Sequence, residues 1–260
     1  MITSTSNQQI KNLIQLQSKA KVRGEQGAFV IEGIKMFEES KAGGHLIKAY
    51  VSESFYMDKL QEEKDYFDFS YEIVSDGVFK EASDTMTPQG IMAIVKKPEY
   101  KIEDLIKKDK LNLMLLEDLR DPGNLGTIIR TSEGAGFDGV VLSKASVDVF
   151  NPKVIRSTMG AIYRMPIVYV DNFLEMLEQL KAESFHIYAA HLKGASYYDK
   201  INYGEKTAIL IGNEANGLSE EAAKVSNHRV KIPMEGQVES LNAAIAAGIL
   251  MYEVYRQRRL

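Results

Sequence analysis

Short apolar segments alternate with longer amphipathic ones along residues 111–256, and this alternation most constrains how the chain can fold. The apolar segments are rich in Val, Ile and Leu and predict strands at residues 111–117, 139–143, 167–170, 186–190, 207–211 and 229–232. Helical spacing predicts helices at residues 125–135, 172–182 and 239–256. Strands of this kind, separated by helices, form a mostly parallel sheet that is covered on both faces. The expected fold is therefore α/β, with ligands at the carboxyl ends of the strands.

The N-terminal part predicts a second, smaller α/β unit. A helix is predicted at residues 7–20, and strands are predicted at residues 29–31, 47–51, 71–74 and 90–95. Residues 96–110 are charged and interrupted by proline, which is typical of a connection. A chain of 260 residues is long enough for two cores. We therefore predict an N-terminal domain at residues 1–98, a linker at 99–110 and a C-terminal domain at 111–260.

Composition excludes several classes of function. The sequence contains no Cys, which excludes disulfides, thiol nucleophiles and thiolate metal sites and fits a reducing compartment. It has no apolar run near the roughly 18 residues that a membrane span needs. We therefore expect a cytoplasmic protein that binds neither a membrane nor a metal. Before Glu25 the only charges are positive, which is compatible with an organellar transit peptide, but we prefer a basic helix.

The net charge of −4 argues against nucleic-acid binding through bulk positive charge, so any such binding must be local. Two stretches, residues 11–23 and 153–164, are locally basic and are candidates for phosphate contacts. Their candidate residues are Lys21, Arg23, Lys153, Arg156 and Arg164. A solvated helix face is the alternative explanation for either stretch.

Residues 134–139, Gly-Ala-Gly-Phe-Asp-Gly, match the G-x-G-x-x-G pattern of dinucleotide-binding proteins. That pattern must follow a strand and open a helix, because the phosphates bind at the helix N-terminus. Here it closes the predicted helix 125–135 and opens the predicted strand 139–143. Helix capping by glycine explains it better, which leaves a nicotinamide-dependent oxidoreductase as an alternative only.

Polar residues and glycines gather where three of the predicted strands end. The first such segment, residues 117–130, contains a Pro-Gly turn, Asn124 and Arg130. These two residues are six positions apart and would face different sides of a regular helix, unless Asn124 caps the helix and turns inward. An ordinary helix cap followed by an exposed arginine is the alternative.

The second segment, residues 209–219, has Gly212 at the end of a buried strand, where the backbone can approach a ligand closely. Ser219 can cap the helix that follows it. A plain strand-to-helix loop is the alternative.

The third segment, residues 230–253, contains Pro233, the turn residue Gly236, and then Ser240 and Asn242 at the start of an Ala-rich helix. Small residues would allow another part of the chain to approach this helix closely. A tightly packed core helix is the alternative.

Together the three segments resemble the signature motifs of the SpoU (TrmH) family of RNA ribose 2′-O-methyltransferases. The matching residues are Asn124, Gly126, Arg130, Gly212, Glu214, Gly217, Ile232 to Met234, Gly236 and Ser240 to Asn242. Weaker similarity at residues 29–33 and 87–93 extends the resemblance to the N-terminal domain. The resemblance implies a C-terminal domain of the SPOUT type with a deep trefoil knot, an N-terminal RNA-binding domain and a homodimer.

The resemblance also implies a cofactor and a set of residue roles. S-adenosyl-L-methionine would bind in the knot near Leu192, Gly212, Ile232, Met234 and Leu241. Arg130 would act at the ribose 2′-oxygen, either as a base or by electrostatic stabilisation, and stabilisation is favoured because a guanidinium holds its proton too tightly to act as a base. The residues that would orient Arg130 and the ribose are Asn124, Glu214, Ser240 and Asn242. The expected substrate is structured RNA, ribosomal rather than transfer RNA.

Two alternatives concern the activity itself. His191 follows a predicted strand and could serve as a base, although a loop histidine without a motif role is more often incidental. A catalytically silent RNA-binding relative is the alternative to an enzyme. The presence of Asn124, Arg130, Glu214 and Asn242 argues against it.

Overall fold

The computed structural model describes residues 1–63, 65–194 and 196–259, which form two compact units. The first unit comprises Met1–Pro98 and Asp148–Tyr163, and the second comprises Glu99–Val147 and Arg164–Leu260. Residues 148–163 therefore pack with the N-terminal unit, whereas the predicted C-terminal domain of residues 111–260 included them. The predicted linker also differs, because it forms a short helix, α6 (Ile102–Leu105), whose Ile102 packs against the core of the second unit.

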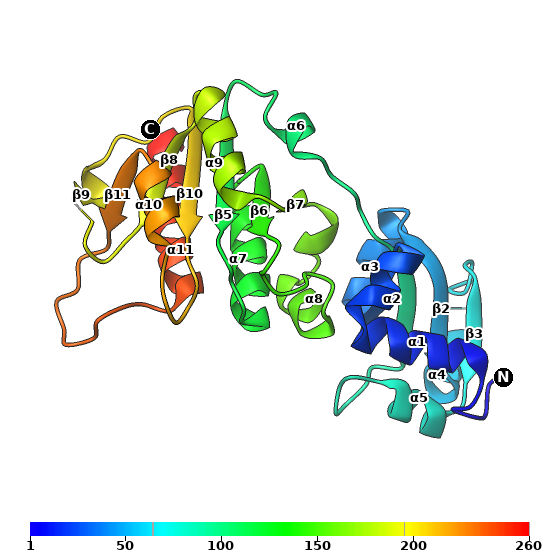
Figure 1. Cartoon of the computed structure of the whole chain (residues 1–260). Coiled ribbons are helices and arrows are strands. Elements are labelled where there is room, and N and C mark those ends of the chain that lie inside the picture. Colours follow the sequence, from blue (N-terminus) through cyan, green and yellow to red (C-terminus); the bar gives the residue numbers. More distant parts are fainter. Residues whose placement is uncertain (64, 195, 260) are drawn as a thin grey trace. The chain divides into compact units, whose positions relative to one another are not determined.

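In the first unit the described residues form a four-stranded mixed sheet in the order β1-β4-β2-β3 (Figure 1). The strands are β1 (Ala28–Glu32), β2 (Leu46–Ser52), β3 (Tyr71–Val74) and β4 (Ile91–Lys96). The helices are α1 (Gln8–Ser18), α2 (Ala20–Gln26), α3 (Ile34–Ala42), α4 (Glu53–Glu62), α5 (Asp76–Ala82), α8 (Pro152–Thr158) and the 3₁₀ helix η1 (Ala161–Tyr163). The predicted helix 7–20 ends at Ser18 because Lys19 adopts an extended backbone conformation, which starts a separate helix.

The segment of residues 148–163 joins the first unit through buried contacts. The Arg23 guanidinium pairs with the Asp148 carboxylate at 2.6 Å, and the Arg23 side chain is only 4% exposed. The rings of Phe29 and Phe150 lie 4.8 Å apart between their centroids. Sequence order gives no indication of these contacts, because they join residues more than one hundred positions apart.

In the second unit the described residues form a seven-stranded sheet in the order β7-β6-β5-β10-β8-β11-β9, and all its neighbouring strands are parallel (Figure 1). This confirms the predicted mostly parallel α/β sheet. The strands are β5 (Leu111–Leu116), β6 (Gly139–Ser143), β7 (Ile167–Val170), β8 (His186–Ala190), β9 (Ser196–Tyr197), β10 (Lys206–Ile211) and β11 (His228–Lys231). The remaining helices are α7 (Pro122–Gly134), α9 (Phe173–Ala182), the 3₁₀ helix η2 (Tyr198–Lys200), α10 (Glu220–Val225) and α11 (Ala243–Arg259).

Helices cover both faces of this sheet. On one face, α9 and α10 pack over a buried cluster that includes Leu111, Leu113 and Leu115 of β5. The alternation of side chains along a strand sends the intervening residues of β5 to the other face. There α7 and α11 pack against each other, with Ser132 Oγ 3.3 Å from Met251 Sδ. None of the described helices is long and apolar enough to cross a membrane.

The last helix begins later than its composition predicts. The expected helix 239–256 starts at Ala243, because the Asn242 side chain accepts hydrogen bonds from the backbone N–H groups of Ala244 and Ile245. This is the geometry of a helix N-cap. Residues 239–242 therefore remain outside the helix and can line a site.

Candidate active site

The three motif segments meet at one edge of the seven-stranded sheet. They follow the carboxyl ends of β5, β10 and β11, and β10 lies directly beside β5 in the sheet. Since the strands are parallel, their carboxyl ends point to the same edge. Sheet order therefore gathers groups that are far apart in the sequence.

The cap of α7 turns Asn124 inward. The cap itself is Asp121, whose carboxylate accepts a hydrogen bond from the Asn124 backbone N–H at 2.7 Å, and Pro122 occupies the first helical position. Asn124 thus lies inside the first turn rather than at the cap, so the cap interpretation of this residue is wrong. Its side chain is buried and points to the site, whereas Arg130 on the same helix is exposed.

Asn124 lies at the centre of a polar cluster that joins all three segments. Its Nδ2 donates to Glu214 Oε1 at 3.1 Å, and its Oδ1 accepts from Asn242 Nδ2 at 2.9 Å. Glu214 also accepts from the backbone N–H groups of Arg120 and Asp121, at 3.1 and 3.0 Å. The Asn124 amide is therefore held by partners from the second and third segments, and the Glu214 carboxylate is held by partners from the first.

The environment of Glu214 keeps its carboxyl group ionised. Partial burial by itself would raise the pKa of Glu214, but the hydrogen bonds from Asn124 and from the backbone of Asp121 and Arg120 lower it overall. A fixed negative charge therefore lies at the carboxyl end of β10.

The loop after β10 is a tight turn that only glycine permits at position 212. A Cβ atom on Gly212 would collide with the backbone of Gly217 and Leu218, and Gly217 itself has a positive φ of 70°. Asn213 closes the turn through backbone hydrogen bonds with Gly217 in both directions, at 3.0 and 2.9 Å. Gly212 thus allows a close approach of the chain's own backbone, and it also lines the adjoining cavity.

A cavity of about 910 Å³ opens beside this cluster. All five predicted cofactor residues line it, namely Leu192, Gly212, Ile232, Met234 and Leu241. Four of the predicted catalytic residues line it as well, namely Asn124, Glu214, Ser240 and Asn242. The volume lies within the range of roughly 300–1,000 Å³ that is usual for small-ligand sites.

Arg130 is the one predicted catalytic residue that does not line this cavity. It lies six residues beyond Asn124 on α7, which corresponds to about 9 Å along the helix axis. Within the described part of the chain its side chain makes no hydrogen bond or ion pair. The guanidinium is therefore free to bind a group that approaches α7 from outside.

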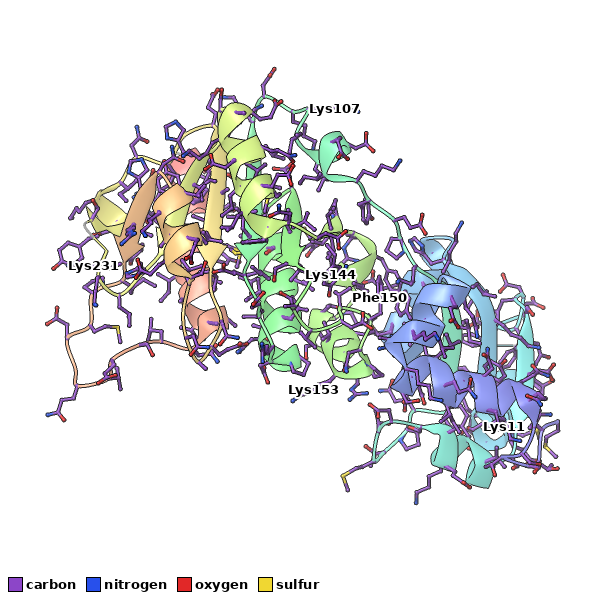
Figure 2. The ribbon with its side chains drawn as sticks, in the orientation of Figure 1. Lys11, Lys107, Lys144, Phe150, Lys153 and Lys231 are labelled. Atoms are coloured by element: carbon purple, nitrogen blue, oxygen red, sulfur yellow. The ribbon has the colours of Figure 1, made fainter. Side chains whose placement is uncertain are left out.

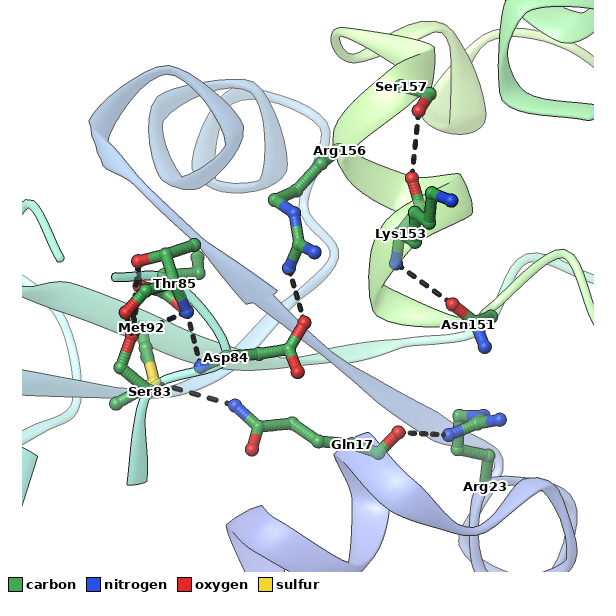
Figure 3. A network of polar contacts seen from close by, with 11 residues as sticks. Gln17, Arg23, Ser83, Asp84, Thr85, Met92, Asn151, Lys153, Arg156 and Ser157 are labelled. Carbon is green, nitrogen blue, oxygen red and sulfur yellow. Dashed lines mark hydrogen bonds and ion pairs between the residues drawn. The ribbon is translucent and has the colours of Figure 1, made fainter. Parts of the chain in front are cut away.

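The predicted RNA contacts are placed very differently from one another. Arg23 is buried and also donates to the backbone oxygens of Leu16 and Gln17, so it stabilises the first unit and is corrected to a structural residue. Arg156 pairs with Asp84 at 2.6 Å (Figure 3). Arg164 of the second unit pairs with Glu133 at 2.8 Å.

The two lysines among these candidates are the more accessible ones. The Lys21 side chain is 86% exposed and lies 3.8 Å from Glu25, and Lys153 is exposed on α8 (Figures 2 and 3). Exposed cations of this kind can contact phosphate without first losing a buried partner.

The glycine pattern at residues 134–139 is a helix end, as predicted. Gly134 is the last residue of α7, Gly136 has a positive φ of 69°, and Gly139 begins β6. The Phe137 N–H donates to the Ser132 backbone oxygen at 2.8 Å, which closes the last turn of α7. These glycines end a helix and begin a strand rather than opening a helix, so the dinucleotide interpretation fails on geometry.

Several residues of the site were not predicted. Glu117 accepts hydrogen bonds from the Ser219 backbone N–H and hydroxyl, at 2.8 and 2.6 Å, and so ties the end of the second segment to β5. Tyr197 and Lys231 line the cavity from β9 and β11. Tyr197 could not be predicted because a two-residue strand such as β9 carries too little periodicity.

The predicted helix cap at Ser219 is confirmed, because the Ser219 hydroxyl accepts a hydrogen bond from the Ala222 N–H.

Comparison with known proteins agrees with this geometry. Residues 111–252 match the model of the SpoU rRNA Methylase family, and residues 7–93 match the MRM3-like substrate binding domain. The chain is 34% identical over 254 residues to the 23S rRNA (guanosine(2553)-2′-O)-methyltransferase RlmP of Bacillus subtilis (strain 168), covering 97% of this chain and 98% of that protein.

Among the solved structures that resemble the whole chain are two RNA methyltransferases. An RNA 2′-O ribose methyltransferase has a TM-score of 0.85 at 31% identity and covers 100% of this chain and 99% of its own. The AdoMet-bound rRNA methyltransferase from Sinorhizobium meliloti has a TM-score of 0.86 at 29% identity and covers 98% and 97% of the two chains. Together with the cluster at the carboxyl edge of the sheet, these matches show that the chain belongs to the SpoU rRNA methylase family.

Proposed function

We propose that this protein transfers a methyl group from S-adenosyl-L-methionine to the ribose 2′-oxygen of a nucleotide in structured RNA. The observation that carries the proposal is the Asn124–Glu214–Asn242 cluster beside a cavity of about 910 Å³. Ribosomal RNA is the preferred substrate class, because two of the relatives named above are rRNA methyltransferases. An rRNA substrate also favours a cytoplasmic location.

The cavity lining fits this cofactor. Apolar side chains from Leu192, Met234 and Leu241 can contact an adenine ring and a methylene chain, while the turn at Gly212 offers backbone polar groups. When bound, S-adenosylmethionine supplies an electrophilic methyl group on a sulfonium. The residues that line the cavity hold it in place and exclude water, which favours methyl transfer through positioning.

On the acceptor side, Arg130 is proposed to stabilise the ribose 2′-oxygen as its proton leaves. A guanidinium stays charged at physiological pH and can donate two parallel hydrogen bonds, so electrostatic stabilisation fits it better than proton abstraction. Asn124, Glu214, Ser240 and Asn242 are proposed to orient the ribose over the methyl donor. His191 accepts a hydrogen bond from the Lys193 N–H through Nδ1, which favours a structural role for it.

We further propose a homodimer in which the partner subunit's Arg130 completes each site. Arg130 is exposed, does not line the cavity of its own chain, and makes no polar contact among the described residues. The neighbouring helix α11 exposes Ile245 and Tyr252, at 55% and 50%, and large apolar side chains of this kind are typical of a subunit interface. We also propose that the second unit contains the deep trefoil knot that the family resemblance implies.

The N-terminal unit is proposed to bind the RNA, and the second unit to carry out methyl transfer. Support comes from the match of residues 7–93 to a substrate binding domain and from the exposed lysines Lys21 and Lys153. Arg156 and Arg164 would have to exchange their carboxylate partners for phosphates. They are therefore proposed as weaker contacts than the lysines.

Incubation with labelled S-adenosylmethionine and unmodified ribosomal RNA tests the proposal. Ribose methylation makes the following linkage resistant to alkali, so new resistant linkages should appear in the digested RNA. Methyl groups found only on bases would overturn the ribose assignment. Binding of RNA and cofactor without any transfer would favour the alternative of a silent RNA-binding relative.

A dimer formed from two different variants tests the shared site. One chain carries Arg130→Ala, and the other carries Ala246→Phe, which fills the cavity. If the partner's Arg130 completes the site, the mixture regains activity at one of its two sites, although each variant alone is inactive. A mixture as inactive as its parents would show that both groups act within one chain.

A further inference from the structure

The cavity contains one positively charged side chain among otherwise acidic and uncharged groups. Of the described residues that line it, Lys231 is the only lysine or arginine, whereas Asp121, Glu214, Glu235 and Glu239 carry carboxylates. Lys231 is half-buried and makes no ion pair within the described ranges, unlike the paired Arg156. A half-buried ammonium without a carboxylate partner has lost part of its hydration and is suited to an anionic ligand.

The fold holds this ammonium in place. Lys231 is the last residue of β11 (Figure 2). Its register partner in the parallel strand β9 is Tyr197, which also lines the cavity. Partners in a parallel pair point to the same face of the sheet. The Lys231 Nζ lies 4.8 Å from the centroid of the Tyr197 ring, within the range of a cation–π interaction.

The loop that carries Tyr197 is itself fixed against β11. The His191 N–H donates to the Val230 backbone oxygen at 2.9 Å, and the Gly194 N–H donates to the His191 oxygen at 2.9 Å. A Cβ atom at Gly194 would come within 2.8 Å of the Val230 carbonyl carbon and 2.9 Å of the Lys231 nitrogen. The close approach of loop and strand, and hence the position of Tyr197, depends on this glycine.

We propose that the Lys231 ammonium binds the carboxylate of the cofactor's amino-acid portion, and that Tyr197 positions the lysine for this contact. The inference rests on the proposed function, because S-adenosylmethionine has its carboxylate as its only anionic group. Its other two charges, the ammonium and the sulfonium, are positive and match the carboxylates of the lining. Lys231 directly precedes Ile232, one of the proposed cofactor contacts, so its side chain can reach the same ligand.

A phosphate of the RNA is the other source of an anion at this position. The half-buried location of Lys231 within the cavity wall favours the cofactor, since the RNA would approach from solvent. Lys193 provides a matched control, because it is an exposed lysine of the adjoining loop that does not line the cavity.

Calorimetric titration of the full chain separates these possibilities, and it needs no tryptophan, which the chain lacks. Lys231→Met is expected to raise the Kd of S-adenosylmethionine and of S-adenosylhomocysteine about tenfold, equivalent to about 1.4 kcal/mol. Decarboxylated S-adenosylmethionine should bind wild type and Lys231→Met equally well. Lys231→Arg should restore most of the affinity, and Lys193→Met should leave every Kd unchanged.

A second pair of variants examines Tyr197. Tyr197→Phe keeps an aromatic face over the ammonium and should bind S-adenosylmethionine like wild type, whereas Tyr197→Leu should weaken binding by a few-fold. Circular dichroism of each variant establishes that it is folded before its Kd is interpreted.

The outcome that overturns the inference is a Lys231→Met variant with a wild-type Kd for S-adenosylmethionine. If that variant instead raises only the KM for RNA, the anion is a phosphate and the carboxylate assignment is wrong. Either result leaves the proposed function intact as long as the wild-type protein binds the cofactor and methylates RNA. Failure of the wild type to bind S-adenosylmethionine would overturn the proposed function itself.

Discussion

Asn242 donates a hydrogen bond from Nδ2 to Oδ1 of Asn124 across 2.9 Å, although the two residues lie 118 positions apart in the sequence. The same Asn242 side chain uses its Oδ1 to cap α11. A single amide therefore fixes the start of the last helix and the orientation of the polar cluster in the candidate site. The Asn242 side chain therefore contributes both to the stability of α11 and to the arrangement of the site.

Asn124→Asp should lower turnover about 10- to 100-fold, because it replaces the amide donor to Glu214 with a second negative charge at a cost of about 1–3 kcal/mol. Single-turnover methylation measures the effect. Asn172→Asp is the matched control, since Asn172 also donates to a glutamate but does not line the cavity. Equal losses of turnover in both variants would show that the cluster has no special role.

Glu214→Gln should destabilise the protein at neutral pH, because the Gln amide cannot accept every hydrogen bond that the carboxylate accepts. The pKa of Glu214 is lowered in the folded protein, so its ionised form contributes stability above the unfolded pKa of about 4.3. This contribution is lost as pH falls through the lowered folded pKa. The difference in unfolding free energy between wild type and variant should therefore shrink on acidification. A constant or growing difference would contradict the assignment.

Gly212→Ala should destabilise the second unit by about 1–3 kcal/mol, because the new methyl group would collide with the backbone of Gly217 and Leu218. Gly236→Ala provides the control, since a Cβ atom at Gly236 meets nothing within 4 Å. Denaturant unfolding of both variants measures the effect. A Gly212→Ala protein as stable as Gly236→Ala would show that the turn rearranges at little cost.

Arg130→Lys should lower turnover by about 100-fold or more while leaving cofactor affinity and stability unchanged. The lysine keeps the charge but loses the planar fork of donors. Stability should be unaffected because the Arg130 side chain is exposed and makes no polar contact among the described residues. Near-normal turnover of Arg130→Lys would show that two parallel hydrogen bonds from a guanidinium are not needed.

Arg23→Met should destabilise the first unit by about 1–3 kcal/mol, because it removes the donor to the Leu16 and Gln17 backbone oxygens and the partner of Asp148, whose side chain is 30% exposed. Lys21→Met, two residues earlier and 86% exposed, should have little effect on stability but should weaken RNA binding and reduce its salt dependence. Thermal unfolding and RNA titration at two salt concentrations measure the two effects. If Arg23→Met remained fully stable, the structural role of Arg23 would be wrong.

Local sequence patterns were sufficient to predict most strands of the second unit and to identify its motifs. The predicted strands from residue 111 to residue 232 correspond to β5, β6, β7, β8, β10 and β11, because continuous Val, Ile and Leu runs are a local signal of buried parallel strands. The glycine pattern at residues 134–139 was also resolved locally, since capping depends only on neighbouring residues. The resemblance to the SpoU motifs, rather than any local pattern, implied that Gly212 and Asn242 belong to one site.

The contacts that these residues make became visible only in the folded chain. Sequence could not show that Gly212 makes room for the chain's own Gly217, that Arg23 is buried against Asp148, or that residues 148–163 pack with the first unit. It also could not place Lys231 beside Tyr197, because the strand that carries Tyr197 is only two residues long. These contacts join distant parts of the chain. Which residues come into contact depends on the order of the strands in the sheet and on the space left after packing. No local pattern of residues encodes these two properties.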